Sequence, residues 1–429
     1  MSAPMDRRDR RPSGDAAVPR DERAPREAST PRDASTPREP LGPRREAPYD
    51  PELLRGLLLG EPTLLPALPR PVASASASRL YLIGEAARAC VLERDGVASL
   101  SASTCVLGAF DGVHVGHRAL VAAAVKAARA RAVPAVAVTF DPDPARVLAG
   151  PADNAELLGV GERLRVLASL GVDALLVVPF TPELARMSHE SFLTDVLAAA
   201  VSPLEAHVGS NFRMGAGGLG TVEALAAFAR PLGVSVRGHD LACADGAPVS
   251  ATRIRSLVRQ GEVAEAARLL RRPHAVRGTV VHGRGEGTSF GFPTANVELA
   301  PVSCRPAEGV YAAVAVAGGH AWPAAVNVGA PRSFGGQEGV PFLEATLLGF
   351  SGDLYGSELA VCFVEWLREP RSFSSLAELE GTVLGNVEWV RRYVGEGDLL
   401  AACPREAPGP SRPGEASELS RPREAGGHT

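Results

Sequence analysis

The stretch TCVLGAFDGVHVGHRALVAAAVKAARARA, residues 104–132, decides the fold of the first half of this chain. It begins with a short apolar run, which is typical of a strand buried on both faces. A turn containing Gly108 and Gly112 follows, and the stretch ends in a segment with helical spacing. A strand that leads through a tight turn into a helix is the repeating unit of a parallel α/β sheet.

The same alternation continues downstream of this stretch. The runs AVAVTF (135–140) and ALLVVPF (174–180) are short, apolar and rich in β-branched residues, and AELLGVGERLRVLASLG (155–171) between them has helical spacing. Alternating strands and helices favour a sheet whose strands run parallel and are covered on both faces. We therefore predict a parallel α/β domain over residues 78–262.

The pattern changes after residue 262. Short valine-rich runs broken by Gly and Pro indicate an antiparallel barrel or sandwich, and they lie at 275–281, 309–318, 324–329, 343–350 and 359–367. A segment with helical spacing follows at 375–395. These features predict a second domain of a different class over residues 268–400.

Both ends of the chain have a composition unlike the rest. Residues 1–77 and 401–429 are rich in Pro, Arg, Ala and Ser, and the first segment repeats itself in REASTPRDASTPREP. Such segments bury too little apolar surface to offset the entropy lost on ordering. We expect both to be disordered, apart from a short helix within PELLRGLLLG (51–60).

The overall composition excludes several classes of protein. A net charge of −4 with 45% hydrophobic residues gives no global basic field, so a nucleic-acid partner is not expected. Lys126 is the only lysine, which excludes a GK[ST] phosphate loop. Six cysteines without CxxC spacing, no apolar run of about 20 residues and no signal peptide lead us to expect a soluble, cytoplasmic protein without membrane partners.

The first candidate site is the turn that carries His114 and His117. In a parallel sheet this turn lies at the ligand-binding edge, where the free N–H groups of the following helix attract anions. Imidazoles there can donate hydrogen bonds to phosphate oxygens. From these residues alone two other interpretations stay open: the histidines are solvated capping residues, or they are a weak metal-binding pair.

Two later segments offer further anion-binding groups. VSATRIRSLVRQGE (249–262) places Arg253 and Arg255 in the first turn of a predicted helix capped by Ser250 and Thr252, where a bound anion would relieve the conflict with the helix dipole. Arg253 is as well explained by solvent exposure, and Arg255 is the candidate phosphate ligand. Asn211 precedes a glycine-rich run, which a flexible connector would also explain.

At this point a family resemblance is clear. In order, GAFDGVHVGH, VTFDPDP, VGSNFRMGAGGLG and SATRIR resemble the nucleotidyltransferase half of the prokaryotic bifunctional riboflavin kinase/FMN adenylyltransferase (FAD synthetase) family. GRGEGTSFGFPTAN, AVNVGAPRSFGG and LEATLLGFSGDLYG resemble its riboflavin kinase module. The resemblance covers about residues 80 to 396. It implies an α/β Rossmann-like nucleotidyltransferase domain followed by an antiparallel β-barrel riboflavin kinase domain with a C-terminal helix.

The resemblance also implies roles in the first domain, which would transfer AMP from ATP to FMN and release pyrophosphate. His114, His117 and Arg255 are the expected catalytic residues. The expected nucleotide-binding residues share the turn and the later segments: Gly108, Phe110, Asp111, Gly112, Asn211 and Thr252. Three positions depart from the family pattern, since Ala109 replaces Asn, Asp143 replaces His and Ala251 replaces Ser. Each lost hydrogen bond to a charged group costs about 1.5–3 kcal/mol.

In the second domain the resemblance implies phosphate transfer from ATP to the ribityl 5′-hydroxyl of riboflavin. Glu344 is the expected general base. Gly283 and Gly291 would offer backbone N–H groups to phosphates, and Thr294 and Asn296 would hold Mg²⁺ through hard oxygen ligands. Without the resemblance, Thr294 and Asn296 read as residues of an ordinary turn and Glu344 as a surface charge.

Three hypotheses follow for the whole chain. The first is a bifunctional enzyme that takes riboflavin, FMN and ATP as small-molecule substrates, requires Mg²⁺ and produces FMN and then FAD. The second keeps only the kinase, with an adenylyltransferase domain degraded at Ala109, Asp143 and Ala251. The third is a binding protein that senses flavin or nucleotide without turnover.

Overall fold

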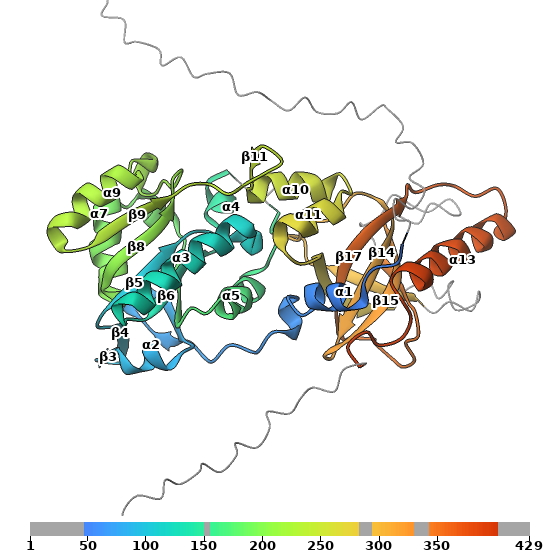
Figure 1. Ribbon diagram of the computed structural model, residues 1–429, viewed down its shortest axis with the longest axis horizontal. Helices are drawn as coiled ribbons and strands as arrows, with labels where there is room; N and C mark the ends of the chain where they lie inside the picture. The colour runs from blue at the N-terminus through green and yellow to red at the C-terminus, as the bar shows by residue number, and fades with distance from the viewer. Residues whose placement is uncertain (1–46, 150–154, 283–293, 330–342, 402–429) are drawn as a thin grey trace, which may run out of the picture. The chain divides into compact units, whose positions relative to one another are not determined.

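The computed structural model describes residues 47–149, 155–282, 294–329 and 343–401. Within these ranges the first part of the chain forms an α/β sheet and the second part a closed barrel (Figure 1). Both predicted architectures are therefore present, in the predicted order.

The α/β part is built on a seven-stranded sheet with the strand order β1-β2-β7-β6-β5-β8-β9. Strands β5 to β9 pair in parallel, whereas β1 and β2 add an antiparallel edge that the sequence pattern did not predict. The strands are β1 (Val72–Ala73), β2 (Arg79–Leu82), β5 (Ser103–Leu107), β6 (Ala135–Asp141), β7 (Ala174–Pro179), β8 (Pro203–Gly209) and β9 (Ser235–His239). Every residue of β5 is buried, as a central parallel strand requires.

Helices cover both faces of this sheet. One face packs against α3 (Val115–Arg131) and α5 (Val160–Ser169), and Figure 1 shows α3 lying along β5 and β6. The other face packs against the π-helical segment η4 (Phe192–Ala198), α8 (Ala199–Val201), α9 (Val222–Ala229) and the hairpin of β3 (Val91–Arg94) and β4 (Val97–Leu100). Shorter elements are α2 (Glu85–Ala89), α4 (Pro144–Ala149), α6 (Pro182–Arg186), α7 (His189–Ser191), β10 (Cys243–Ala244) and β11 (Ala247–Pro248).

Two helices separate the sheet from the barrel along the chain. They are α10 (Ala251–Arg259) and α11 (Val263–Leu270), and both bury an apolar stripe that includes Ile254, Val258 and Leu269. Spacing of three to four residues between buried positions places them on one helix face.

The barrel closes through six antiparallel strands in the order β12-β13-β16-β15-β14-β17. They are β12 (His274–Val281), β13 (Thr294–Leu299), β14 (Gly309–Ala317), β15 (His320–Val328), β16 (Leu343–Leu347) and β17 (Glu358–Arg368). The interior is filled by alternate residues such as Tyr311, Val326 and Phe363. The structure thus selects the barrel over the sandwich that the sequence also allowed. Helix α13 (Leu376–Tyr393) packs on its outer face.

The segment before the sheet differs from the expectation of disorder over residues 1–77. Residues 47–77 contain the helix expected at 51–60, which is α1 (Pro51–Leu58), together with β1 and two short 3₁₀ turns. Leu54 and Leu58 of α1 are buried in the cluster on the outer face of the barrel. This apolar pair explains why the segment is ordered despite its high Pro and Ala content.

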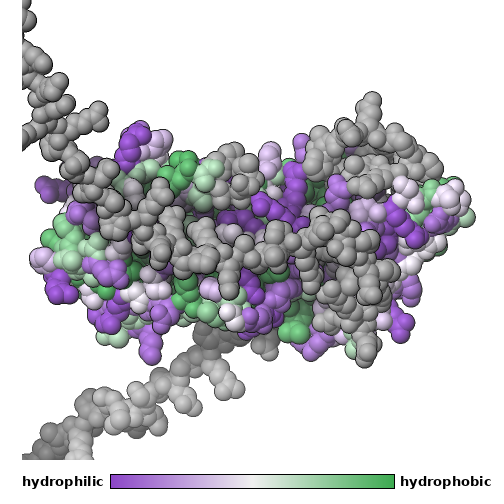
Figure 2. Space-filling model, turned by 90° about the horizontal axis from the view of Figure 1, so that it is seen from above, coloured by the Kyte–Doolittle hydropathy of each residue, from purple (hydrophilic) through white to green (hydrophobic). Residues whose placement is uncertain are grey.

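The surface carries both hydrophilic and hydrophobic residues. On the face shown in Figure 2, hydrophilic side chains alternate with small hydrophobic areas. Among the helices in the described ranges, none has the length and apolarity needed to cross a bilayer.

Candidate active sites

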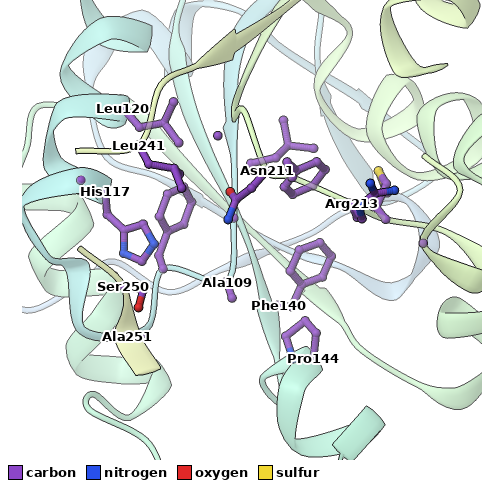
Figure 3. Close-up of a pocket in the computed structure, with 18 of the residues that line it drawn as sticks. Ala109, His117, Leu120, Phe140, Pro144, Asn211, Arg213, Leu241, Ser250 and Ala251 are labelled. Atoms are coloured by element: carbon purple, nitrogen blue, oxygen red, sulfur yellow. The ribbon is translucent and has the colours of Figure 1, made fainter. Parts of the chain in front are cut away.

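A cavity of about 850 Å³ opens at the carboxyl ends of the parallel strands. Its wall takes residues from the ends of β5, β6, β7, β8 and β9 and from the N-termini of α3 and α10. In Figure 3, His117, Leu241 and Ser250 lie on one side of this space, and Phe140 and Pro144 lie on the other. Ligands of open α/β sheets bind at this edge.

The turn between β5 and α3 has an unusual backbone. Phe110, Gly112 and Val113 all have positive φ angles, of 56°, 74° and 41°. For a β-branched residue such as Val113 this conformation is an outlier that surrounding contacts must hold in place. The φ angle of 74° favours glycine at position 112, and a Cβ there would also lie 2.9 Å from Cδ1 of Leu157. The predicted close turn is therefore present, and it is strained.

His114 and His117 both lie in the cavity wall, as predicted for a phosphate-binding turn. His114 caps α3 by accepting a hydrogen bond at Nδ1 from the His117 backbone N–H at 3.4 Å, and the two rings stack with centroids 3.7 Å apart. Burial and the nearby positive charge of Arg272 lower the pKa of His114 to about 4. Burial, His114 and Arg163 lower the pKa of His117 well below its usual value. Both imidazoles are neutral near pH 7, and each retains one N–H donor.

A second helix begins at the same cavity. Ser250 caps α10 by accepting a hydrogen bond from the Arg253 N–H, and Ser250 and Ala251 line the wall. The structure corrects the expectation that Thr252 is also a cap, because the helix has already begun at Ala251 and Thr252 is exposed outside the wall. Two helix N-termini pointing into one cavity favour an anionic ligand.

Asp111, Gly112 and Arg255 were expected to contact the nucleotide, and the structure places all three behind the turn instead of in the wall. The Asp111 carboxylate accepts backbone hydrogen bonds from Leu157 and Leu158. Arg255 donates to that carboxylate at 2.9 Å and to the Ala155 carbonyl. These contacts satisfy the buried charges of Asp111 and Arg255 and hold the strained turn.

Other predicted residues do line the cavity. Gly108, Phe110 and Asn211 belong to its wall, with Asn211 following the end of β8. The side opposite the histidines carries Arg213 but is otherwise mostly apolar and aromatic (Figure 3), and the apolar residues packed around Phe140 there are Phe180, Phe192, Phe212, Met187 and Leu184. The cavity therefore has a polar half beside α3 and α10 and an aromatic half beside β6 and β7.

The three departures from the family pattern fall in different places. Ala109 and Ala251 line the cavity, so each removes a polar group from the wall. Asp143 does not line it: the carboxylate accepts from the Ala145 N–H and lies 3.6 Å from Arg163. Only two of the three substitutions therefore alter the surface that a ligand would meet.

The second site lies on the barrel. Thr294 and Asn296 belong to β13, which excludes the alternative interpretation that they are residues of an ordinary turn. Asn296 pairs with Glu344 across β13 and β16, and Asn327 of β15 pairs with Glu344 from the other side. The Thr294 hydroxyl donates to Glu344 Oε1 at 2.6 Å. Strand pairing thus brings together three predicted residues that lie up to 50 positions apart.

Side chains alternate between the two faces of β16 around Glu344. Leu343 and Ala345 are fully buried inside the barrel, so Glu344 faces the opposite side, where it is partly buried. Among residues in the described ranges, none donates a hydrogen bond to its second oxygen, Oε2. Gly283 and Gly291 lie outside the described residues.

The donors beside Glu344 fit a magnesium ion. A Thr hydroxyl and an Asn amide oxygen are hard ligands, and the Thr294 oxygen keeps a lone pair for a cation while its proton is held by Glu344. The described residues contain no cluster of three or more His, Cys, Asp or Glu side chains that would hold a metal without substrate.

Several residues that support the sites were not predicted. Arg163 donates to the carbonyls of Ala109 and Phe140, and Arg272 donates to the Gly112 carbonyl, all at 2.7–2.9 Å. Both arginines are almost fully buried. Their partners lie 23 to 160 positions away, so no local pattern could identify them.

The two sites define a chain that combines a nucleotidyltransferase domain with a kinase barrel. Consistent with this, residues 96–253 match the family model of FAD synthetase and residues 270–394 match that of riboflavin kinase. The chain belongs to the bifunctional riboflavin kinase/FMN adenylyltransferase family. It is 34% identical over 294 residues to the family member of Escherichia coli strain K12. The aligned region covers 68% of this chain and 93% of that protein.

Other relatives agree with this assignment. The bifunctional riboflavin kinase/FMN adenylyltransferase of Pseudomonas fluorescens is 32% identical over 66% of this chain and 91% of its own length. A crystal structure described as a macrolide-efflux protein from Streptococcus pneumoniae has a TM-score of 0.62 and 29% identity, covering 69% of this chain and 96% of that one. The match thus covers more than nine-tenths of the length of each of these three relatives.

Proposed function

We propose that this chain makes FMN and FAD by phosphorylating riboflavin with ATP and then adenylylating FMN with release of pyrophosphate. We assign the adenylyltransferase to residues 78–262 and the riboflavin kinase to residues 268–400. The observation that carries the proposal is the pair of unlike sites: a cavity with two helix N-termini and neutral histidines, and a carboxylate held beside two hard oxygen donors.

In the adenylyltransferase, the FMN phosphate attacks the α-phosphorus of ATP, and the bond to the pyrophosphate oxygen breaks. No protein nucleophile is needed, so the protein contributes positioning and charge stabilisation. His114 and His117 donate hydrogen bonds to phosphate oxygens, and Asn211 helps to hold the nucleotide. The aromatic half of the cavity takes the isoalloxazine ring. Asp111, Gly112 and Arg255 act indirectly, by fixing the turn from which the histidines project.

In the kinase, the ribityl 5′-hydroxyl attacks the γ-phosphorus of ATP, and ADP leaves. Glu344 accepts the proton of that hydroxyl through Oε2, while Thr294 orients the carboxylate through Oε1. Thr294 and Asn296 would hold Mg²⁺, which neutralises phosphate charge when bound. Trp389 stacks on Tyr393 and packs against the outer barrel cluster, which fits a core residue better than a flavin contact.

One assay tests the proposal against its alternatives. The pure protein is incubated with riboflavin, ATP and magnesium, and the flavins are separated by chromatography. FAD is the expected product. If only FMN forms, the protein is a riboflavin kinase without adenylyltransferase activity. If riboflavin is unchanged, the protein is a binding protein without turnover. The match to FAD synthetase over residues 96–253 gives the kinase-only alternative no support. The cytoplasmic location expected from the sequence stays a prediction.

A further inference from the structure

A row of three polar side chains, Glu205, His207 and His239, leads from beneath α3 to the wall of the adenylyltransferase cavity. Glu205 and His207 lie two residues apart on β8 and so face the same side of the sheet, where they are 1% and 2% exposed. His239 ends the neighbouring strand β9, opposite Gly209, and belongs to the cavity wall. Only the last member of the row can therefore meet a ligand.

The members of this row contact one another. Nδ1 of His207 lies 2.8 Å from Nε2 of His239, with the two rings tilted by only 20°. Nε2 of His207 lies 3.2 Å from Oε1 of Glu205. That second contact is not aligned as a hydrogen bond, and this nitrogen has no other partner among the described residues. The Glu205 carboxylate also forms ion pairs with Arg131 and Arg237.

These contacts determine where the protons lie. Burial is the main reason why the pKa of His207 falls to about 4, so its ring is neutral and carries a single proton. The negative charge of Glu205 favours that proton on Nε2, because the other tautomer would bring the negative lone pair of Nε2 within 3.2 Å of a carboxylate oxygen. Nδ1 of His207 then accepts, and Nε2 of His239 must be the donor between the rings. A His239 ring whose single proton lies on Nε2 has Nδ1 as a hydrogen-bond acceptor.

The place of His239 in the cavity indicates what it meets. Asp240, Leu241 and Ala242 follow it in the wall, and a Cβ at Gly116 of α3 would lie 3.5 Å from Ala242. This is the polar half of the cavity, and Figure 3 shows Leu241 on the same side as His117 and Ser250, away from Phe140. The flavin ring fits the aromatic half, so the nucleoside of ATP is the neighbour of His239.

We propose that His239 accepts a hydrogen bond from a neutral donor of the ATP nucleoside, either the adenine amino group or a ribose hydroxyl, and that buried His207 and Glu205 hold it in the accepting tautomer. The proposal rests on the adenylyltransferase function proposed above. His239 is then a specificity residue, whereas His207 and Glu205 are positioning residues that act only through it.

The first experiment combines variants with nucleotide analogues. His239→Gln keeps an amide at the position of Nε2, next to His207, but removes the acceptor at Nδ1. His239→Asn places a polar group near Nδ1 and loses contact with His207. The control is His320→Gln, a residue on the barrel with a side chain 59% exposed. Each full-length protein receives ATP, purine riboside triphosphate, which lacks the amino group, or 2′-deoxy-ATP and 3′-deoxy-ATP, which each lack one hydroxyl.

In FMN adenylylation by the unaltered protein and by His320→Gln, we expect the KM for one class of analogue to be about three- to tenfold higher than the KM for ATP. That class is either the analogue without the amino group or the analogues without a hydroxyl. This preference should fall to about one in His239→Gln and persist in part in His239→Asn, and the class affected identifies the donor. An unchanged preference in His239→Gln, or equal weakening for ATP and every analogue, would overturn the proposal. Riboflavin phosphorylation by the same molecules should stay unchanged and shows that the variants fold.

A second measurement reads the tautomer directly and does not require turnover. Long-range ¹H–¹⁵N NMR spectra of the full chain should show His239 protonated at Nε2 and bare at Nδ1, and ATP should move the Nδ1 resonance. Protonation at Nδ1, or an unmoved resonance with saturating ATP, would overturn the proposal. ATP and each analogue are also titrated into the protein while the His117 ring resonances are recorded. These titrations give the binding affinity of each nucleotide and repeat the comparison of ATP with its analogues. If FAD does not form but these spectra behave as expected, the function has failed and the binding role of His239 stands.

His207→Phe tests the positioning role. It should turn His239 into a mixture of tautomers and remove most of the preference for ATP, with little change in the kcat of adenylylation. Glu205→Gln should shift the same tautomer balance in the same direction if it folds. A His239 tautomer and an ATP preference that both survive His207→Phe would overturn the positioning role.

Discussion

The cavity of the α/β sheet and the Glu344 site of the barrel achieve related chemistry in opposite ways. The first is assembled at strand ends and helix N-termini, from a turn whose backbone is strained at Phe110 and Val113. The second lies on relaxed strands, where cross-strand pairing alone sets Asn296 and Asn327 on either side of Glu344. The first site therefore depends on distant buried contacts that hold one loop, and the second on strand register. Substitutions should affect the two sites independently.

The sharpest separation of the two sites comes from Glu344→Gln. Loss of the general base should lower the kcat of riboflavin phosphorylation by about 10²- to 10⁴-fold, because Gln cannot accept the proton. Conversion of supplied FMN to FAD should be unchanged. Both rates are measured by chromatography of the flavins, and an equal fall in the two would contradict separate sites.

The converse change is His117→Leu, which removes a donor from the cavity at nearly constant size. Adenylylation of FMN should fall by about ten- to a hundredfold, as expected for one hydrogen bond to a charged phosphate. Phosphorylation of riboflavin should be retained. A kinase rate that falls as far as the adenylylation rate would show that the variant has lost its fold.

A buried histidine makes the unfolding free energy of the barrel depend on pH. Burial lowers the pKa of His274 to about 4, below the ordinary 6.5, so the unfolded chain binds the proton more tightly and stability falls as pH drops from 6.5 towards 4. Between pH 7 and pH 5 this group should cost about 2 kcal/mol. All three tryptophans lie between residues 322 and 389, so their fluorescence reports denaturant unfolding of the barrel.

The matched variant for this measurement is His274→Gln, which can still donate to the Cys304 carbonyl that His274 Nε2 contacts at 2.8 Å. Its unfolding free energy should lose about 2 kcal/mol less over the same pH interval. Identical pH profiles for the two proteins would show that His274 is not the group that titrates.

The smallest expected effect is an increase in the rate of FMN adenylylation. Ala109 lines the cavity where the family pattern has Asn, so Ala109→Asn restores a donor to the wall. We expect adenylylation to rise about three- to fivefold, which corresponds to about 1 kcal/mol, while the kinase rate stays constant. Ala109→Leu adds volume without a donor and should produce no gain; a similar rise in both variants would exclude the hydrogen bond as the cause.

Much of the architecture could be predicted from local pattern. The runs that became β5, β6 and β7 are mostly apolar, and both histidines of the first turn lie in the cavity wall. Strand β13 was missed because GFPTAN has the composition of a turn, and only its pairing with β16 makes Thr294 and Asn296 strand residues.

The remaining errors concern contacts between distant parts of the chain. Arg255 looked like a phosphate ligand because a cation in the first turn of a helix lacks an obvious partner. Its partner Asp111 lies 144 positions earlier. The contact between His207 and His239 likewise depends on the parallel register of β8 and β9. Local spacing carries no information about such register.

The packing of α1 bears on how the riboflavin kinase can be dissected. The backbone N–H of Tyr49 donates to the Tyr393 carbonyl, and Leu54 and Leu58 fill the outer barrel cluster with residues of α13. A fragment cut at the start of the barrel would leave this apolar hollow open to water and prone to self-association. We therefore expect an isolated barrel to be more soluble when residues 47–66 are co-expressed with it or joined to it in a circularly permuted gene.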